Sequence, residues 1–233
     1  MTNGEHTSTR FDIELNAIRD SVVLMGELVR EQFRLALESL NSGNILAEQV
    51  MDIGYRVDGL EVEIDRKCNL VLAKRQPEAV DLRTILTALK ITTDIERIGD
   101  QAELMAQKAA MLLQHGGLNI VRLVDISGCA NLALSMVDNA MEAFAQSDVD
   151  IAAQVIHQNK QVNADYSFIT RNLISSMLEN PRAISVALDF LFMVKAIERI
   201  GDHAKNISEY VIFMVKGYDV RHSSIEEIEN LTL

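Results

Sequence analysis

The chain contains few of the residues that interrupt regular structure. Its 233 residues include two prolines, 11 glycines and no tryptophan. A sheet protein with many tight turns needs more glycine and proline than this, and no stretch has the biased composition of a disordered segment. With 48% apolar residues, the chain is long enough for one large or two small helical domains with a hydrophobic core.

Basic residues are also scarce, and this bears on the partners of the protein. The chain has 22 Lys and Arg against 34 Asp and Glu, a net charge of −12. Binding to nucleic acid needs clustered basic side chains against the phosphates, so the composition argues against that partner. Cations or basic protein surfaces fit such a charge better, although the charge alone also keeps a protein soluble.

Cysteine usage and hydropathy bear on location. Cys68 and Cys129 lie neither in a C-x-x-C pair nor near a histidine, so we interpret them as reduced core residues of a cytoplasmic protein. Residues 1–10 lack the apolar stretch of a signal peptide. The most apolar run, residues 184–197, contains two charged residues and is too short to cross a bilayer. We therefore expect a soluble cytoplasmic protein that reaches a membrane only through partner proteins.

Apolar residues recur at steps of three and four along most of the chain, which predicts amphipathic helices. Three such segments precede the linker His115-Gly116-Gly117, and three follow it. The breaks between them fall at turn residues and prolines, and the expected helices lie at about 11–40, 46–76, 78–114, 118–146, 148–179 and 181–216. The sequence thus predicts an all-α fold of six long helices, with Asn180 as a helix cap and a frayed tail after Gly217.

The second half of the chain repeats the first. The pentad Glu96-Arg97-Ile98-Gly99-Asp100 returns as Glu198-Arg199-Ile200-Gly201-Asp202, and Pro77 and Pro181 hold matching places ahead of the two pentads. Long helices with short connections pack as antiparallel bundles. We therefore predict two tandem, duplicated three-helix bundles at residues 10–115 and 118–217. The pattern leaves open whether the bundles are separate or merge into one body.

Acidic side chains form a stripe on the third helix of each predicted unit. Glu96, Asp100 and Glu103 lie at i, i+4 and i+7, and Glu198, Asp202 and Glu209 form the second set. Both sets lie roughly opposite the apolar seam, so we expect them to face outward. Like charges at i, i+4 cost a helix about 0.2–0.5 kcal/mol per pair, which a metal ion or a basic partner would offset. A plain solvated face is the alternative.

Neighbouring residues refine this picture. Gly99 and Gly201 leave room for a close approach by another backbone, by an ion shell or by a packed helix. His203 is expected at the surface. The acids Asp58, Glu61 and Asp65 of the second helix have a weak counterpart in the second unit, and we interpret them as a solvated face.

Catalytic signatures are missing from the sequence. None of the five histidines follows a glutamate at the Glu-x-x-His spacing of a di-iron carboxylate enzyme, and no phosphate-binding glycine loop or H-E-x-x-H motif occurs. No combination of nucleophile, base and orienting residue is apparent. The sequence therefore predicts a protein that is not an enzyme.

The paired E-R-I-G-D pentads resemble the PhoU family of phosphate-transport accessory proteins. The segments from Ala73 to Pro77, Asp81-Leu82-Arg83 and from Tyr210 to His222 are also similar to that family, so the resemblance covers nearly the whole chain. It implies two similar three-helix bundles, often as a homodimer. It also implies a negative regulator of phosphate uptake and of the phosphate regulon, which couples the phosphate ABC transporter to its sensor histidine kinase.

The resemblance further implies a possible metal centre. Some members of the family carry iron or zinc clusters on E-x-x-x-D motifs, which correspond here to Glu96 with Asp100 and Glu198 with Asp202. The main alternative is thus a helical protein whose principal role is to bind metal at surface clusters. A generic helical scaffold is a further alternative, but it leaves the pentads unexplained.

Overall fold

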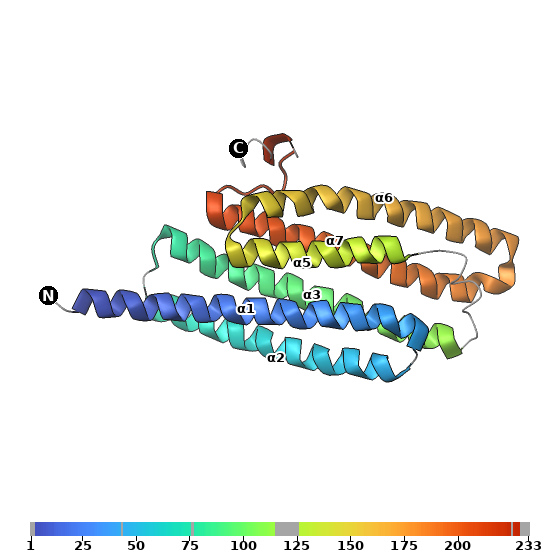
Figure 1. The fold of residues 1–233 in the computed structure, drawn as a ribbon, viewed down its shortest axis with the longest axis horizontal. Helices are drawn as coiled ribbons and strands as arrows, with labels where there is room; N and C mark the ends of the chain where they lie inside the picture. The colour runs from blue at the N-terminus through green and yellow to red at the C-terminus, as the bar shows by residue number, and fades with distance from the viewer. Residues whose placement is uncertain (1–2, 43, 76, 115–125, 225, 229–233) are drawn as a thin grey trace.

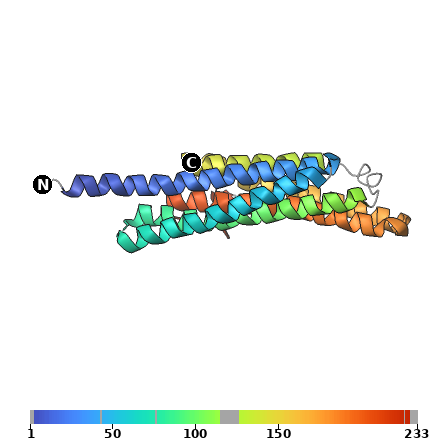
Figure 2. The same cartoon turned by 90° about the horizontal axis from the view of Figure 1, so that it is seen from below.

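The computed structural model describes residues 3–42, 44–75, 77–114, 126–224 and 226–228, and over these residues the fold is all-α, without strands. Its helices are α1 (Asn3–Ser42), α2 (Asn44–Lys74), α3 (Ala79–Gln114), α5 (Ser127–Gln146), α6 (Val149–Glu179), the short η1 (Pro181–Ala183) and α7 (Ile184–Lys216). They lie nearly parallel to one long axis, so the body is elongated, and the beginning of α1 projects beyond the other helices (Figures 1 and 2). The predicted all-α fold of long helices is confirmed.

Each half of the chain forms a three-helix bundle, and the two bundles share one interface. α1, α2 and α3 pack on one another, as do α5, α6 and α7, but the most extensive packing between any two helices joins α3 to α7. These two helices run in opposite directions: the Lys108 ammonium near the end of α3 pairs with Asp189 near the start of α7 at 2.8 Å. At the other end, Arg83 of α3 donates a hydrogen bond to the Met214 carbonyl of α7.

A single hydrophobic core runs through both bundles. Its fully buried side chains include Phe33 of α1, Ile98 of α3, Phe144 of α5 and Phe190 of α7, all in one cluster. α1 also contacts α5 of the other bundle. There Arg19 Nη2 donates to the Phe144 carbonyl and to Ser147 Oγ at the end of α5. The bundles therefore merge into one body, which the sequence pattern left open.

The helix boundaries of the second half follow local residue chemistry. The Asp148 side chain caps α6 by accepting hydrogen bonds from the backbone amides of Asp150 and Ile151. Pro181 begins η1, as expected for proline at a first helical position. Asn180 makes no side-chain cap bond there, so its predicted capping role is wrong. Gly217 ends α7 with φ of 74°, a left-handed conformation that glycine adopts without strain.

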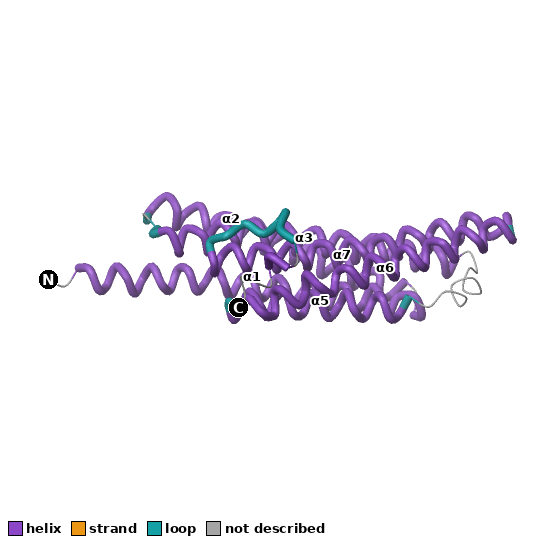
Figure 3. The backbone as a smooth tube through the Cα atoms, turned by 90° about the horizontal axis from the view of Figure 1, so that it is seen from above, coloured by secondary structure: helices purple, strands orange, loops and turns teal. Residues whose placement is uncertain are grey.

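The segment after α7 is packed rather than frayed, which corrects the prediction for the tail. It leaves the last turn of α7, as Figures 1 and 3 show, and folds back over the start of α6 and the end of α7. Val220 and Ile228 are 1% and 3% exposed and belong to the core cluster. Ser224 and Glu227 cap each other here: the Ser224 backbone amide donates to Glu227 Oε2, and the Glu227 backbone amide donates to Ser224 Oγ.

Some sequence predictions lie outside the described residues. These are the linker at 115–117, the boundary between the two predicted units, and the start of the fourth predicted helix at residue 118. Among the helices that are described, none is long and apolar enough to cross a membrane.

Candidate functional site

Acidic side chains from two helices meet in the first unit. Glu96, Asp100 and Glu103 of α3 face Asp58, Glu61 and Asp65 of α2, and we call these six residues the first-unit acidic surface. Partial burial raises the pKa of Glu96, and the charges of Asp100, Glu61 and Asp58 raise it further. The pKa of Glu61 is raised for the same reasons, by burial and then by Asp65, Asp58 and Asp100. The six carboxylates thus repel one another across the α2–α3 interface.

No cationic side chain neutralises this surface directly. Among the described residues, none of the six carboxylates forms an ion pair, and the nearest cationic influence on Glu96 and Asp100 is a longer-range attraction to Arg97. Arg97 itself is exposed. Within the described part of the chain, this group of like charges therefore has no internal counterion.

Glu103 is the one member of the surface that a neighbouring side chain fixes. Its Oε1 accepts a hydrogen bond of 3.3 Å from Gln32 of α1, a residue with no exposed surface. The same Gln32 amide group donates to the Val50 carbonyl of α2. A glycine makes room for this arrangement, because a Cβ at Gly54 would lie 1.8 Å from Glu103 Oε1.

Gly99 and Gly201 each accommodate a buried amide oxygen. A Cβ at Gly99 would lie 2.9 Å from Gln32 Oε1, and a Cβ at Gly201 would lie 3.1 Å from Asn159 Oδ1. Both amide oxygens are buried without a hydrogen-bond partner. Of the approaches expected from the sequence, the structure shows helix packing: each glycine lets a polar side chain of a neighbouring helix come close.

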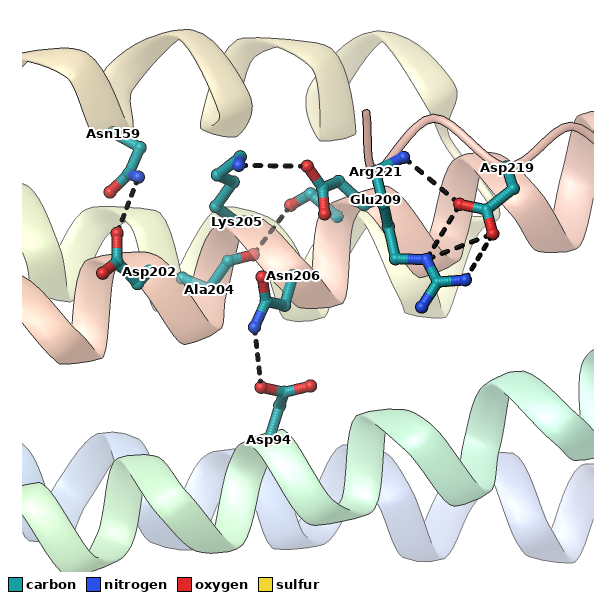
Figure 4. A network of polar contacts seen from close by, with 10 residues as sticks. Asp94, Asn159, Asp202, Ala204, Lys205, Asn206, Glu209, Asp219 and Arg221 are labelled. Atoms are coloured by element: carbon teal, nitrogen blue, oxygen red, sulfur yellow. Dashed lines mark hydrogen bonds and ion pairs between the residues drawn. The ribbon is translucent and has the colours of Figure 1, made fainter. Parts of the chain in front are cut away.

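The acids of the second unit have a different environment, which corrects the expectation that both stripes face outward. Glu198 is 7% exposed and pairs with Lys195, and Glu209 is 5% exposed and pairs with Lys205 at 3.2 Å. Burial raises the pKa of Glu209 even with that lysine beside it. Figure 4 shows this pair beside Arg221 of the C-terminal segment.

Asp202 is likewise committed to an internal contact. Its Oδ1 accepts a hydrogen bond of 2.9 Å from Asn159 of α6, as Figure 4 shows. The two pentads are therefore equal in sequence but unequal in structure. Only the first leaves its carboxylates unpaired.

A polar junction lies between the two bundles, and it includes a residue expected at the surface. His203 of α7 is 9% exposed, and its Nδ1 lies 2.6 Å from Oδ1 of Asp94, which is 3% exposed on α3. Asn206 donates to the same carboxylate oxygen, as Figure 4 shows. The predicted surface position of His203 is thus wrong, because α3 covers the side of α7 on which it lies.

Sequence reasoning missed two sets of residues that the structure brings together. Glu61 and Asp65 repeat the i, i+4 spacing of Glu96 and Asp100, and that spacing was the signal that they belong to the same surface rather than to a separate solvated face. Asp94 lies one position from Ile95 in an otherwise apolar seam, and a charged residue there signals a buried polar contact.

The fit of these residues to iron or zinc can be assessed from their placement. Carboxylate oxygens suit hard and borderline cations, and the first-unit acidic surface contains six carboxylates. In the part of the chain that is described, however, no three His, Cys, Asp or Glu side chains converge on a point that would hold an ion. Metal binding at Glu96, Asp100 and Glu103, or at Glu198, Asp202 and Glu209, stays a prediction.

The raised pKa values predict how stability depends on pH. A carboxyl group whose pKa is higher in the folded state binds more protons in that state than in the unfolded chain. Its ionisation therefore destabilises the folded protein, and this cost grows as the pH rises above the unfolded-state pKa near 4.5. The variant Glu61→Gln with Glu96→Gln should therefore be more stable than the parent at pH 7, by about 0.5 kcal/mol. This advantage should shrink towards pH 4.5, as urea unfolding at several pH values would measure. An advantage that stays constant with pH would contradict the assignment.

Comparison with known proteins identifies relatives along the whole chain. The family profile described as the PhoU domain matches twice, at residues 22–109 and 126–211. The chain is 39% identical over 230 residues to the phosphate-specific transport system accessory protein PhoU homolog of Pseudomonas aeruginosa, covering 97% of this chain and 95% of that protein. It is 36% identical to the phosphate-specific transport system accessory protein PhoU of Escherichia coli, covering 97% and 94% of the two chains.

Solved structures show the same fold. The crystal structure of PhoU from Pseudomonas aeruginosa matches with a TM-score of 0.83 and 38% identity, over 89% of this chain and 100% of that one. The phosphate transport system regulatory protein PhoU from Streptococcus pneumoniae matches with a TM-score of 0.81 over 90% and 99% of the two chains. At 24% identity, the second similarity concerns the fold alone.

Proposed function

The chain belongs to the PhoU family, and on that premise we propose that it is a negative regulator of phosphate uptake and of the phosphate regulon. Its relatives in Pseudomonas aeruginosa and Escherichia coli are named as accessory proteins of the phosphate-specific transport system. In this proposal the protein acts in the cytoplasm, as a homodimer, through contacts with the phosphate ABC transporter and with the sensor histidine kinase of the regulon. It binds partners and performs no catalytic step.

The observation that carries the proposal is the first-unit acidic surface. Among the described residues, six carboxylates lie together without an internal counterion, and partial burial, followed by their mutual repulsion, raises the pKa of Glu61, Glu96 and Glu103. A basic surface on a partner protein would relieve that repulsion. Docking of such a partner is therefore favoured at the first-unit acidic surface. Charge complementarity of this kind mainly increases the rate and specificity of association.

The second unit contributes less to such a surface. Glu198 and Glu209 are buried against lysines of their own helix, and Asp202 is held by Asn159. Removing Asp202 would leave the buried Asn159 amide without its acceptor, and replacing Glu198 or Glu209 would change a buried position, so each change would disturb the fold. The proposal therefore places the docking contact on α2 and α3 rather than on two equal surfaces.

A variant that neutralises the surface tests the proposal. Glu61→Gln, Asp65→Asn, Glu96→Gln and Asp100→Asn together keep the side-chain shapes but remove four charges. We expect normal helicity by circular dichroism, binding to the transporter and kinase weakened at least about tenfold, and release of repression of a phosphate-regulon reporter in phosphate-rich medium.

The matched control removes four exposed acids of α1 and α2 that do not belong to the first-unit acidic surface. Asp20→Asn, Glu27→Gln, Glu48→Gln and Asp52→Asn change the net charge equally but leave the first-unit acidic surface intact. Repression should persist in this control. If repression persists in both variants, or is lost in both, the acidic surface is not the docking site.

A cation is the alternative occupant of the same surface. The repulsion that favours a basic partner also favours an iron or zinc ion, so we keep metal binding as the second candidate role. Elemental analysis of protein purified without added metal separates the two. Stoichiometric iron or zinc that is lost in the four-acid variant supports the metal role, and metal-free protein that still represses excludes it.

A further inference from the structure

The α6–α7 hairpin extends past the helix that should cover it. α5 has 20 residues, whereas α6 has 31 and α7 has 33, and Figures 1 and 2 show the hairpin reaching beyond the first turn of α5. We call residues 171–188, which include the end of α6, η1 and the start of α7, the hairpin tip. Four large apolar side chains are exposed on it: Ile174 (48%), Leu178 (79%), Ile184 (41%) and Leu188 (42%).

The charge of the hairpin tip is opposite to that of the whole protein. Arg171 and Arg182 are exposed and form no ion pair or hydrogen bond with other described residues. Glu179 is the only acidic residue between positions 168 and 188. The next acid along α7, Asp189, is already paired with Lys108. The hairpin tip is thus apolar and basic, although the whole chain has a net charge of −12.

The acidic surface of the first unit is too distant to cancel this local charge. Glu103 lies five residues before Lys108, whose partner Asp189 lies five residues into α7. At 1.5 Å per residue, this separates Glu103 from the first residue of α7 by about 15 Å along the molecule. The Debye length at physiological salt is about 8 Å, so an approaching anionic surface would experience mainly the arginines.

We propose that the hairpin tip docks on the surface of an anionic lipid bilayer. Leu178 and Ile174 would enter the boundary between headgroups and acyl chains, while Arg171 and Arg182 extend to the lipid phosphates. The tip is narrow and lies at one end of an elongated body, so this contact can form without bringing the acidic faces near the membrane. The sequence-based expectation is that the protein reaches a membrane only through partner proteins, whereas this proposal gives it a direct contact with lipid. The proposal does not depend on the proposed regulatory function.

Vesicle sedimentation of the full-length protein tests this inference. We expect binding to vesicles of phosphatidylcholine with phosphatidylglycerol, weaker binding to phosphatidylcholine alone, and loss of binding as salt is raised. Each basic residue near such a surface contributes about a fivefold change, so Arg171→Gln with Arg182→Gln should weaken binding roughly 30-fold. Ile174→Ser with Leu178→Ser should weaken it at least about tenfold.

Matched controls lie on α2, away from the hairpin tip. Arg56→Gln with Arg66→Gln removes two exposed arginines, and Val62→Ser removes an apolar side chain that is 69% exposed. Both controls should bind as the parent does. The proposal is overturned if the parent binds no vesicles, if it binds both lipid compositions equally, or if the controls lose binding as the tip variants do. Binding of the tip to an acidic polypeptide without binding to vesicles would also overturn it, in favour of a protein partner.

Discussion

Replacement of Asp94 with alanine is expected to lower the free energy of unfolding by about 3 kcal/mol, because it breaks a buried polar pair between the two bundles. Asp94 is 3% exposed, and its carboxylate faces His203 and Asn206 across the α3–α7 interface. Without it, the buried His203 loses its polar partner and the half-buried Asn206 loses its acceptor. Chemical denaturation at pH 7 would measure the loss, and the melting temperature should fall by about 6–12 °C.

Two further variants define the origin of that effect. Asp94→Asn keeps one acceptor for Asn206 and should lose less stability than the alanine variant. Asp52→Ala removes an exposed carboxylate on α2 and should change stability by less than about 0.5 kcal/mol. If Asp94→Ala were as stable as Asp52→Ala, the polar junction would contribute nothing to the union of the bundles.

The second large effect is expected in the C-terminal segment. Val220→Ser together with Ile228→Ser should lower the free energy of unfolding by about 3–6 kcal/mol, since each side chain contributes about 1.5–3 kcal/mol by its burial. Both residues are almost fully buried in the core cluster. Loss of their packing should also increase the exposure of Glu209, because Arg221 of the segment lies beside it. Thermal unfolding would measure the change in stability.

Tyr218 provides the matched control for this segment. It lies two residues before Val220 but is 52% exposed, so Tyr218→Ser should leave stability nearly unchanged. Faster cleavage by a protease after Arg221 in the double variant, but not in the control, would show that the segment has detached. Equal stability of parent and double variant would restore the original view of a frayed tail.

The sequence predicts the helices well because apolar periodicity reflects burial directly. Val22, Met25 and Val29 mark the buried side of α1, and all three have no exposed surface. The merger of the bundles could not be predicted in this way. A seam shows that one side of a helix is covered, but it does not identify the covering helix, and the α3–α7 contact joins residues about a hundred positions apart.

The acidic side chains show the same limit at finer scale. Glu198 lies opposite the main seam of its helix, which predicts exposure for a helix packed on one side. α7 instead packs against α3, α5 and α6, so little of its circumference is left for solvent. Lys195 lies one turn before Glu198 and makes its burial tolerable, a pairing that the pentad pattern does not display.

The antiparallel pairing of α3 with α7 has a consequence for the origin of the chain. The two repeats contribute corresponding helices to one shared seam, so either repeat in isolation would leave its third helix uncovered along an apolar side. An ancestor with a single repeat would have needed a second copy of itself to close that seam, with two-fold symmetry. Duplication and fusion would then have made the association permanent. The two halves could afterwards diverge, so that the acids of the first unit are unpaired while those of the second are paired with neighbouring side chains.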